Sequence, residues 1–199
     1  MEPGGGVLKG PADSPFNRRG FLGEAAKLIA QGAGALLAEK VAPRRHFRPP
    51  GALLEPAFLA ACTRCGYCMD ACPVHAVIAA PTSAGLAAGT PILEPTHQPC
   101  IACEGMFCAN VCPTGALVPP LSGWTRERIG ELALDAERCI AFQGIECGVC
   151  VRTCPVGATA IDLDFQGRPV ILQGCVGCGV CVRACVTSPS SLAVSIPEG

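Results

Sequence analysis

Apolar and polar residues alternate over short stretches of this chain, and this pattern predicts small strands. Residues 160–165 read Ala-Ile-Asp-Leu-Asp-Phe, residues 169–172 read Pro-Val-Ile-Leu, and Gly167 lies between them. Successive side chains of a strand point to opposite faces, so alternation with a glycine turn predicts a β-hairpin. Short apolar runs also begin near residues 76, 116 and 160, each after a Cys-Pro turn. The repeated unit is therefore expected to be a cysteine loop, a short helix, a strand and a return strand.

The remaining patterned residues predict surface features and a small core. Charged residues at positions 126, 127, 128 and 131 have helical spacing and predict an exposed helix face. Tyr67 and Trp124 are expected to pack against the core, because aromatic residues make up only 5% of the chain. His46, His75 and His97 are interpreted as linker and surface residues.

Composition indicates a fold that is stabilised by bound cofactors or covalent cross-links. The 199 residues include 24 Gly, 19 Pro and 16 Cys, and few large side chains that could fill a conventional core. A chain of this kind needs covalent or metal staples to offset its conformational entropy. The cysteines supply the candidates.

The cysteines fall into four copies of one pattern, and none is left over. Three cysteines lie close together in each copy, and a fourth follows after three intervening residues. A Pro follows the fourth cysteine in three copies, whereas copy four has Val186 and a Thr-Ser-Pro-Ser-Ser stretch, for which a looser helix and a more exposed cluster are expected. The copies are Cys62, Cys65, Cys68 and Cys72; Cys100, Cys103, Cys108 and Cys112; Cys139, Cys147, Cys150 and Cys154; and Cys175, Cys178, Cys181 and Cys185.

This spacing indicates [4Fe–4S] ligation. A C-x2-C-x2-C loop can wrap three corners of a cubane, and in two-cluster ferredoxins the fourth cysteine ligates the other cluster of the pair. Glycines within the loops, at positions 66, 148, 177 and 179, permit the tight turns. All sixteen cysteines are thus expected to bind four [4Fe–4S] clusters, within an α+β fold of two bacterial-type two-cluster ferredoxin modules, fused or interleaved.

Other uses of the cysteines fit the pattern less well. Zinc sites favour pairs of cysteines separated by longer spacers. A disulfide framework would crowd adjacent triplets that make poor bridge partners. The C-x3-C-x2-C spacing of radical S-adenosylmethionine enzymes is missing. No Ser/His/Asp set, phosphate loop or carboxylate pair is recognisable, so no enzymatic activity is expected.

The first residues resemble a twin-arginine export signal. Arg18 and Arg19 precede Phe-Leu and a mildly hydrophobic Ala- and Leu-rich run over residues 24–38. The interpretation is a signal or anchor over residues 1–42, a basic Pro-rich linker over 43–55 with solvated charges, and a four-cluster domain over 56–199. No stretch offers the roughly 20 apolar residues of a spanning helix.

Charge is divided unevenly along the chain. Residues 1–48 contain eight Lys/Arg and four Asp/Glu, a net of +4, whereas residues 49–199 contain seven and twelve, a net of −5. The acidic part excludes nucleic acid as a partner. The basic segment could contact anionic headgroups, which makes peripheral membrane association an open alternative.

Taken together, these motifs resemble the NapG/MauM family of ferredoxin-type proteins. The resemblance covers the twin-arginine start, the order of the four motifs and the insertions in copies two and three. Its most specific part is the run from Cys139 to Cys150, with Phe-Gln-Gly between Cys139 and Cys147.

The resemblance implies a periplasmic electron carrier on the outer face of the inner membrane. It would relay electrons from a quinol-oxidising, NapH-like ferredoxin-type membrane subunit to a periplasmic reductase, such as nitrate reductase, or a cytochrome. The alternative is a structural iron–sulfur subunit that organises a redox complex without carrying electrons. The hairpin between copies three and four supports adjacent pairing of the copies, whereas the resemblance favours nested pairing, one with four and two with three.

Overall fold

The computed structural model describes residues 46–197, which belong to one compact unit spanning residues 42–199. The export signal predicted over residues 1–42 lies outside the described residues. Within residues 46–197, no helix is long and apolar enough to cross a membrane.

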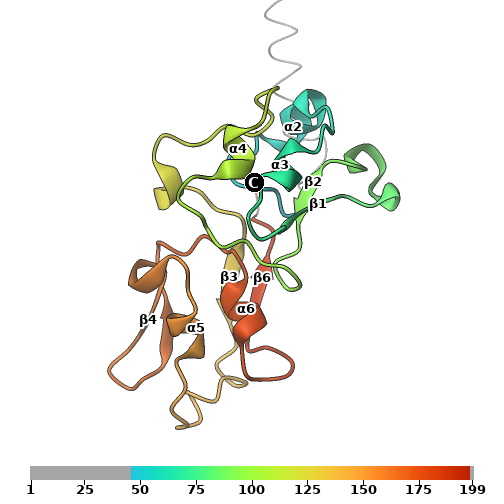
Figure 1. Cartoon of the computed structure of the whole chain (residues 1–199). Helices are drawn as coiled ribbons and strands as arrows, with labels where there is room; N and C mark the ends of the chain where they lie inside the picture. Colours follow the sequence, from blue (N-terminus) through green and yellow to red (C-terminus); the bar gives the residue numbers. More distant parts are fainter. Residues whose placement is uncertain (1–45, 198–199) are drawn as a thin grey trace, which may run out of the picture. The chain divides into compact units, whose positions relative to one another are not determined.

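The first half of this unit, residues 46–128, is called the first module (Figure 1). Its only sheet within the described residues pairs β1 and β2 antiparallel, with Val77 opposite Leu93. The elements follow the order α2 (Glu55–Ala61), α3 (Tyr67–Asp70), β1 (Val77–Ala79), η1 (Thr82–Ala87), β2 (Pro91–Leu93), α4 (Phe107–Asn110) and η2 (Gly123–Thr125).

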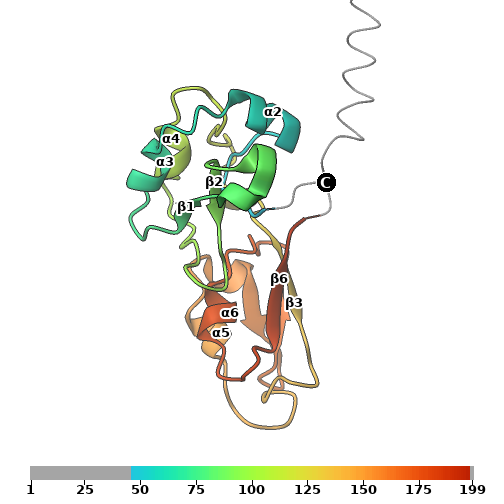
Figure 2. The ribbon, with the colours of Figure 1, turned by 90° about the vertical axis from the view of Figure 1, so that its right-hand side faces the viewer.

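Residues 129–197 form the second module, which contains two antiparallel strand pairs and two short α-helices. Strand β3 pairs with β6, with Leu134 opposite Leu192, and β4 pairs with β5. Figure 2 shows β3 beside β6 and α5 beside α6. The β4–β5 pair confirms the predicted hairpin. The elements are β3 (Glu131–Leu134), α5 (Val149–Arg152), η3 (Gly157–Thr159), β4 (Ile161–Leu163), β5 (Pro169–Ile171), α6 (Val180–Ala184) and β6 (Leu192–Ser195).

Each of the four short helices next to a cysteine loop begins after a residue in the left-handed conformation. Gly66, Gly148 and Gly179 occupy this position before α3, α5 and α6, with φ between 75° and 88°. Copy two has the buried Met106 there instead, at φ 38°. A left-handed residue turns the chain sharply out of the loop, and glycine does so at the lowest steric cost. The predicted role of the loop glycines is confirmed.

The core is small, and the cysteines are part of it. One cluster packs Phe58, Leu117, Ile129 and Val176 around cysteines of both modules. A second cluster in the second module packs Ile161, Val182 and Leu192 around Cys150 and Cys181. The cofactor ligands therefore take positions that large apolar side chains occupy in other proteins.

The predicted linker over residues 43–55 was drawn too long, because its later residues belong to the folded unit. Phe47 forms a bridge with Leu93, and the Leu53 amide donates to the Ala116 carbonyl. Arg48, expected to be solvated, is completely buried. From Phe47 onward the chain is part of the folded unit, because apolar residues and a buried ion pair attach it there.

Arg48 is buried with its charge fully compensated. Its Nε donates to Glu55 Oε2 at 3.0 Å, and its Nη2 lies 2.5 Å from Glu55 Oε1. Its Nη1 donates to Thr90 Oγ1 at 2.8 Å and to the Pro91 carbonyl at 2.9 Å. The guanidinium also lies 4.4 Å from the centre of the Phe58 ring. A buried charge needs such partners, and this set ties the segment before α2 to β2.

Two other expectations were wrong. Residues 126–131 form no helix, since Glu131 begins β3 and the Glu127 carboxylate accepts the Gly51 amide at 3.0 Å. Strand pairing with β6 outweighs the helical spacing of the charges there. Tyr67 does not pack in the core but is 57% exposed at the start of α3. Trp124 does pack against the first core cluster, as predicted.

Candidate iron–sulfur cluster sites

Four cavities are each lined by four cysteines, and together they use all sixteen. Each cavity holds about 320–360 Å³ of empty space, part of it open to solvent. Three cysteines come from one copy of the motif and the fourth from another copy. Site A has Cys62, Cys65, Cys68 and Cys112; site B has Cys72, Cys100, Cys103 and Cys108; site C has Cys154, Cys175, Cys178 and Cys181; and site D has Cys139, Cys147, Cys150 and Cys185.

These sets show that neighbouring copies pair, one with two and three with four. The nested pairing that the family resemblance favoured is wrong for this chain. Helix α3 packs on α4 and α5 packs on α6. This packing carries the cysteine at the end of each helix over the loop of the neighbouring copy. Each exchange stays within one module, and the shorter loops that it closes cost less conformational entropy than nested pairing would.

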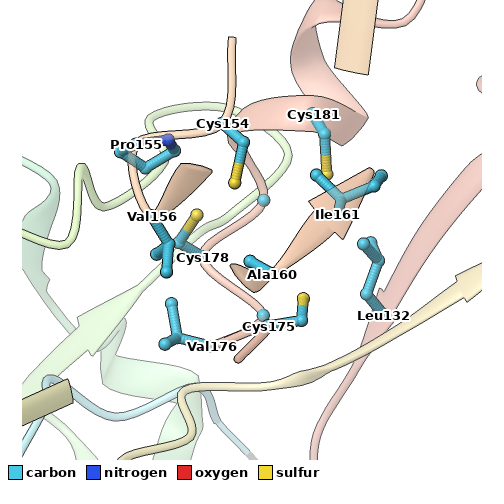
Figure 3. A pocket seen from close by; sticks show the side chains of 12 residues that line it. Leu132, Cys154, Pro155, Val156, Ala160, Ile161, Cys175, Val176, Cys178 and Cys181 are labelled. Atoms are coloured by element: carbon cyan, nitrogen blue, oxygen red, sulfur yellow. The ribbon is translucent and has the colours of Figure 1, made fainter. Parts of the chain in front are cut away.

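Site C illustrates how a cavity is built (Figure 3). The sulfur atoms of its four cysteines point into the same space. Leu132, Val156, Ile161 and Val176 line the rest, so the walls are almost entirely apolar. Four thiolates facing one such cavity match the ligand set of a [4Fe–4S] cluster, one cysteine for each iron. Within residues 46–197, no three Cys, His, Asp or Glu side chains converge closely enough to hold a single ion.

Burial makes these thiols poor acids in the absence of a metal. It raises the pKa of Cys68 and Cys178 to about 11 and that of Cys100, Cys108 and Cys181 to about 12, and neighbouring cysteines add to the increase. Iron ions supply the positive charge that offsets this cost, because metal coordination deprotonates a thiol. The residues therefore fit a cluster whose irons balance several buried thiolates.

The sites follow one another in the order A, B, C, D. Burial is the main cause of the raised pKa at three of the cysteines. A smaller part of each rise comes from the charge of a cysteine that belongs to a neighbouring site. Core packing agrees, because one cluster joins cysteines of A, B and C and the other joins cysteines of C and D. The sulfur pairs are Cys68 and Cys108 between A and B, Cys100 and Cys178 between B and C, and Cys150 and Cys181 between C and D.

The ends of this row differ in exposure. Cys65 of site A is exposed, whereas Cys139 and Cys150 of site D are buried. Copy four was expected to have a looser helix and a more exposed site. The second expectation was wrong, because the cysteines of copy four are buried or half-buried, whereas Cys65 of copy one is exposed. Helix α6 is one residue longer than α3, α4 and α5. Val186 does not open the site, because buried Ser191 covers the Cys185 sulfur.

Backbone amides and hydroxyls donate to several ligand sulfurs. The Ala76 amide lies 3.2 Å from the Cys72 sulfur, and the Leu117 amide 3.4 Å from the Cys112 sulfur. Burial raises the pKa of Cys112, but its hydrogen bonds outweigh burial and leave the pKa below the usual value. Such contacts stabilise sulfur in its ionised, metal-binding form.

Two contacts beside the loops had no signal in the sequence. Trp124 Nε1 donates to the Cys103 carbonyl at 2.9 Å, which fixes the loop of site B. Arg64 donates to the carbonyls of Leu86 and Ala88, at 2.9 and 2.8 Å, and thereby joins the loop of site A to η1. Neither contact follows from spacing, because each links segments more than 20 residues apart.

The histidines lie outside the four sites. None lines any of the four cavities in residues 46–197. His97 is exposed, with its Nδ1 3.6 Å from Glu94 Oε2, and His75 is in a turn with φ 51°. This agrees with the interpretation of these residues as surface groups.

Known protein families with paired iron–sulfur clusters match this chain over the residues that form the four sites. Two models described as a 4Fe–4S dicluster domain match the chain, one over residues 61–116 and 99–158 and the other over 131–186. Together they run from residue 61 to residue 186, which is more than half of the chain. The matches over 61–116 and 131–186 contain the cysteines of sites A and B and of sites C and D.

Curated relatives carry the same names as the family that the motifs suggested. The chain is 44% identical over 122 residues to ferredoxin-type protein NapG of Escherichia coli, covering 61% of this chain and 53% of the relative. It is 41% identical over 132 residues to methylamine utilization ferredoxin-type protein MauM of Paracoccus denitrificans, covering 64% and 59%. It is 38% identical over 174 residues to NapG of Haemophilus influenzae, covering 81% and 61%.

The matched part of the chain thus spans between a half and two thirds of the length of these relatives. The dicluster matches, the four-cysteine sites and the relatives all indicate an iron–sulfur protein with an electron-transfer role. The chain therefore belongs to the 4Fe–4S dicluster family and is similar to the NapG and MauM ferredoxin-type proteins, as its motifs suggested.

Proposed function

We propose that this chain binds four [4Fe–4S] clusters and relays single electrons along the row of sites A to D. The observation that carries this proposal is the row itself, because one core cluster packs cysteines of sites A, B and C together and the other packs cysteines of sites C and D. Each cluster, when bound, accepts and returns one electron. A continuous row is what a relay needs, and separate structural sites would not require it.

The residues of the chain would perform three tasks in this relay. The cysteines bind the irons, four at each site. Apolar side chains such as Ile161 and Val176 exclude water from the cavities and thereby influence the potentials. Cys65 brings site A to the surface, where a redox partner could approach it.

The proposed partners follow from the family resemblance. The donor would be a quinol-oxidising, NapH-like ferredoxin-type membrane subunit, and the acceptor a periplasmic reductase, such as nitrate reductase, or a cytochrome. The proposed location is the periplasm, after folded export through the twin-arginine pathway. Export of the folded protein suits this cargo, since clusters are inserted in the cytoplasm before transport.

Cluster content and redox activity test the relay. Anaerobically purified protein should contain about sixteen irons and about sixteen acid-labile sulfides per chain, as four [4Fe–4S] clusters require. Reduction should give low-temperature electron paramagnetic resonance (EPR) signals, and oxidised partner protein should remove them. Iron near zero would exclude the cluster assignment. Clusters that stay in one redox state while a quinol analogue and the partner subunits turn over would favour the structural alternative.

Export is tested separately. Replacing Arg18 and Arg19 by Lys should retain the protein in the cytoplasm, because the twin-arginine pathway distinguishes arginine from lysine. Cell fractionation with immunodetection measures the outcome. Export that is unchanged by the double substitution would refute the proposed route.

A further inference from the structure

Two hydroxyl groups face the Cys185 sulfur in site D. Thr187 Oγ1 lies 3.2 Å from this sulfur, and Ser191 Oγ lies 3.3 Å from it. Both distances are within hydrogen-bonding range for sulfur. Ser191 is only 3% exposed, so water does not compete for its hydroxyl.

The direction of these hydrogen bonds is fixed by their surroundings. Thr187 Oγ1 already accepts the Ser191 amide at 2.8 Å, so its own proton is free to be donated. A cysteine sulfur bound to iron has no proton and can only accept. Both hydroxyls therefore donate to Cys185 when the site is loaded.

The fourth cysteines of the other copies have different partners. Cys72 receives one backbone amide, and Cys112 receives an amide with a more distant hydroxyl, Thr114 Oγ1 at 3.7 Å. For Cys154 in the neighbouring site C, no donor to the sulfur is found among residues 46–197. Two close hydroxyls on one such sulfur are thus particular to site D in the described structure.

Hydroxyls that donate to a ligand sulfur affect the redox equilibrium of the cluster that this sulfur binds. Donors that stabilise negative charge on a sulfur also favour the more negative, reduced state of a cluster bound to it.

We propose that Thr187 and Ser191 set the reduction potential of site D, raising it above the value that its cysteines alone would give. The inference rests on the proposed relay and adds a direction to it. A reduction potential higher at site D than at the neighbouring site C favours transfer of electrons to site D, so site D is the end of the row where electrons leave. The acceptor protein would then dock at site D, and the donor would dock at the end where Cys65 is exposed.

The test is an EPR-monitored redox titration of full-length, cluster-loaded protein. A Cys147→Ser variant, which removes a ligand of site D, identifies the signal of that site. In Ser191→Ala, the ratio of reduced to oxidised site D at the wild-type midpoint should fall about threefold, or about 28 mV at 59 mV per tenfold change. The other signals should keep their potentials.

Two variants of Thr187 and one control distinguish the effect of losing a hydroxyl from a general structural effect of the substitution. Thr187→Val should lower the potential of site D, whereas Thr187→Ser, which keeps the hydroxyl, should restore it. Thr153→Val is the matched control, because this hydroxyl lies next to Cys154 but bonds to no sulfur, only to the backbone carbonyls of Val149 at 2.9 Å and Cys150 at 3.5 Å. It should leave site D unchanged.

The outcomes distinguish this inference from the relay. Redox-active clusters with an unchanged site D potential in Ser191→Ala and Thr187→Val would overturn the role of the hydroxyls and leave the relay standing. A shift of all four signals by similar amounts would also overturn it, since that indicates a general structural change. Iron near zero in the wild-type protein would refute the relay itself.

Discussion

The buried ion pair of Arg48 and Glu55 gives a quantitative prediction. Arg48 is completely buried and Glu55 is 9% exposed, and the guanidinium uses both Nε and Nη2 to bind the carboxylate. Glu55→Ala would leave a buried cation without its counter-ion. Removing one partner of such a pair costs about 3–5 kcal/mol of unfolding free energy. Helix α2 leads from Glu55 to Cys62, so we expect site A to be lost first.

The predicted cost can be read from a urea titration. With a urea dependence of about 2 kcal/mol/M, a loss of 3–5 kcal/mol lowers the unfolding midpoint by about 1.5–2.5 M. Anaerobic unfolding of loaded protein, followed by circular dichroism and visible cluster absorbance, measures this shift. The control is Arg138→Ala, which breaks an exposed pair with Asp135 at 3.1 Å and should cost less than about 1 kcal/mol.

A double variant tests the electrostatic reasoning directly. Arg48→Met combined with Glu55→Leu removes both charges, so it should recover much of the stability that Glu55→Ala loses. The reasoning would be refuted if Glu55→Ala lowered the urea midpoint by less than about 0.5 M, which corresponds to about 1 kcal/mol. In that case the packing of Phe47 and Leu53 would be sufficient to hold this segment.

Three further predictions concern the sites themselves. Gly177→Ala would place a methyl group 2.0 Å from the Gly130 carbonyl oxygen and should abolish iron binding at site C, whereas Gly167→Ala, with open space around it, should retain full iron content. Cys112→Ser should weaken site A and spare site B, although Cys112 belongs to copy two, and loss of the site B signal in EPR spectra would contradict adjacent pairing. Arg128→Gln should lower the potential of site C, because the charge of Arg128 counteracts the rise that burial causes in the pKa of Cys175, and an unchanged potential in a redox titration would contradict this.

Cysteine spacing carried more information about this protein than any other sequence feature. It grouped the ligands into four sets, and alternation of apolar residues located the β4–β5 hairpin. Both are local patterns, since each is determined by neighbouring residues along the chain. The pairing of the copies is not local, because it depends on α3 packing on α4 and α5 on α6. Spacing alone is compatible with nested pairing as well.

Residues that act through distant contacts could not be predicted in the same way. Arg48 lies in a basic, Pro-rich stretch that looks like a linker, and its burial depends on Thr90 and Pro91, more than 40 residues away. The helical spacing around residue 128 was overridden by packing. Gly130 is so closely packed that a methyl group there would lie 2.6 Å from Val194 Cγ2.

The two different ends of the row have a kinetic consequence. A ferredoxin with one accessible cluster has to leave its reductant before it can meet its oxidant, so its turnover includes a dissociation step. Here Cys65 is exposed at site A, whereas site D lies three sites further along. If donor and acceptor dock at opposite ends of the row, as proposed, both can be bound at the same time. Steady-state kinetics of donor, carrier and acceptor would then follow a ternary-complex pattern. Dilution of the carrier would slow turnover only by dissociating the complex of the three proteins.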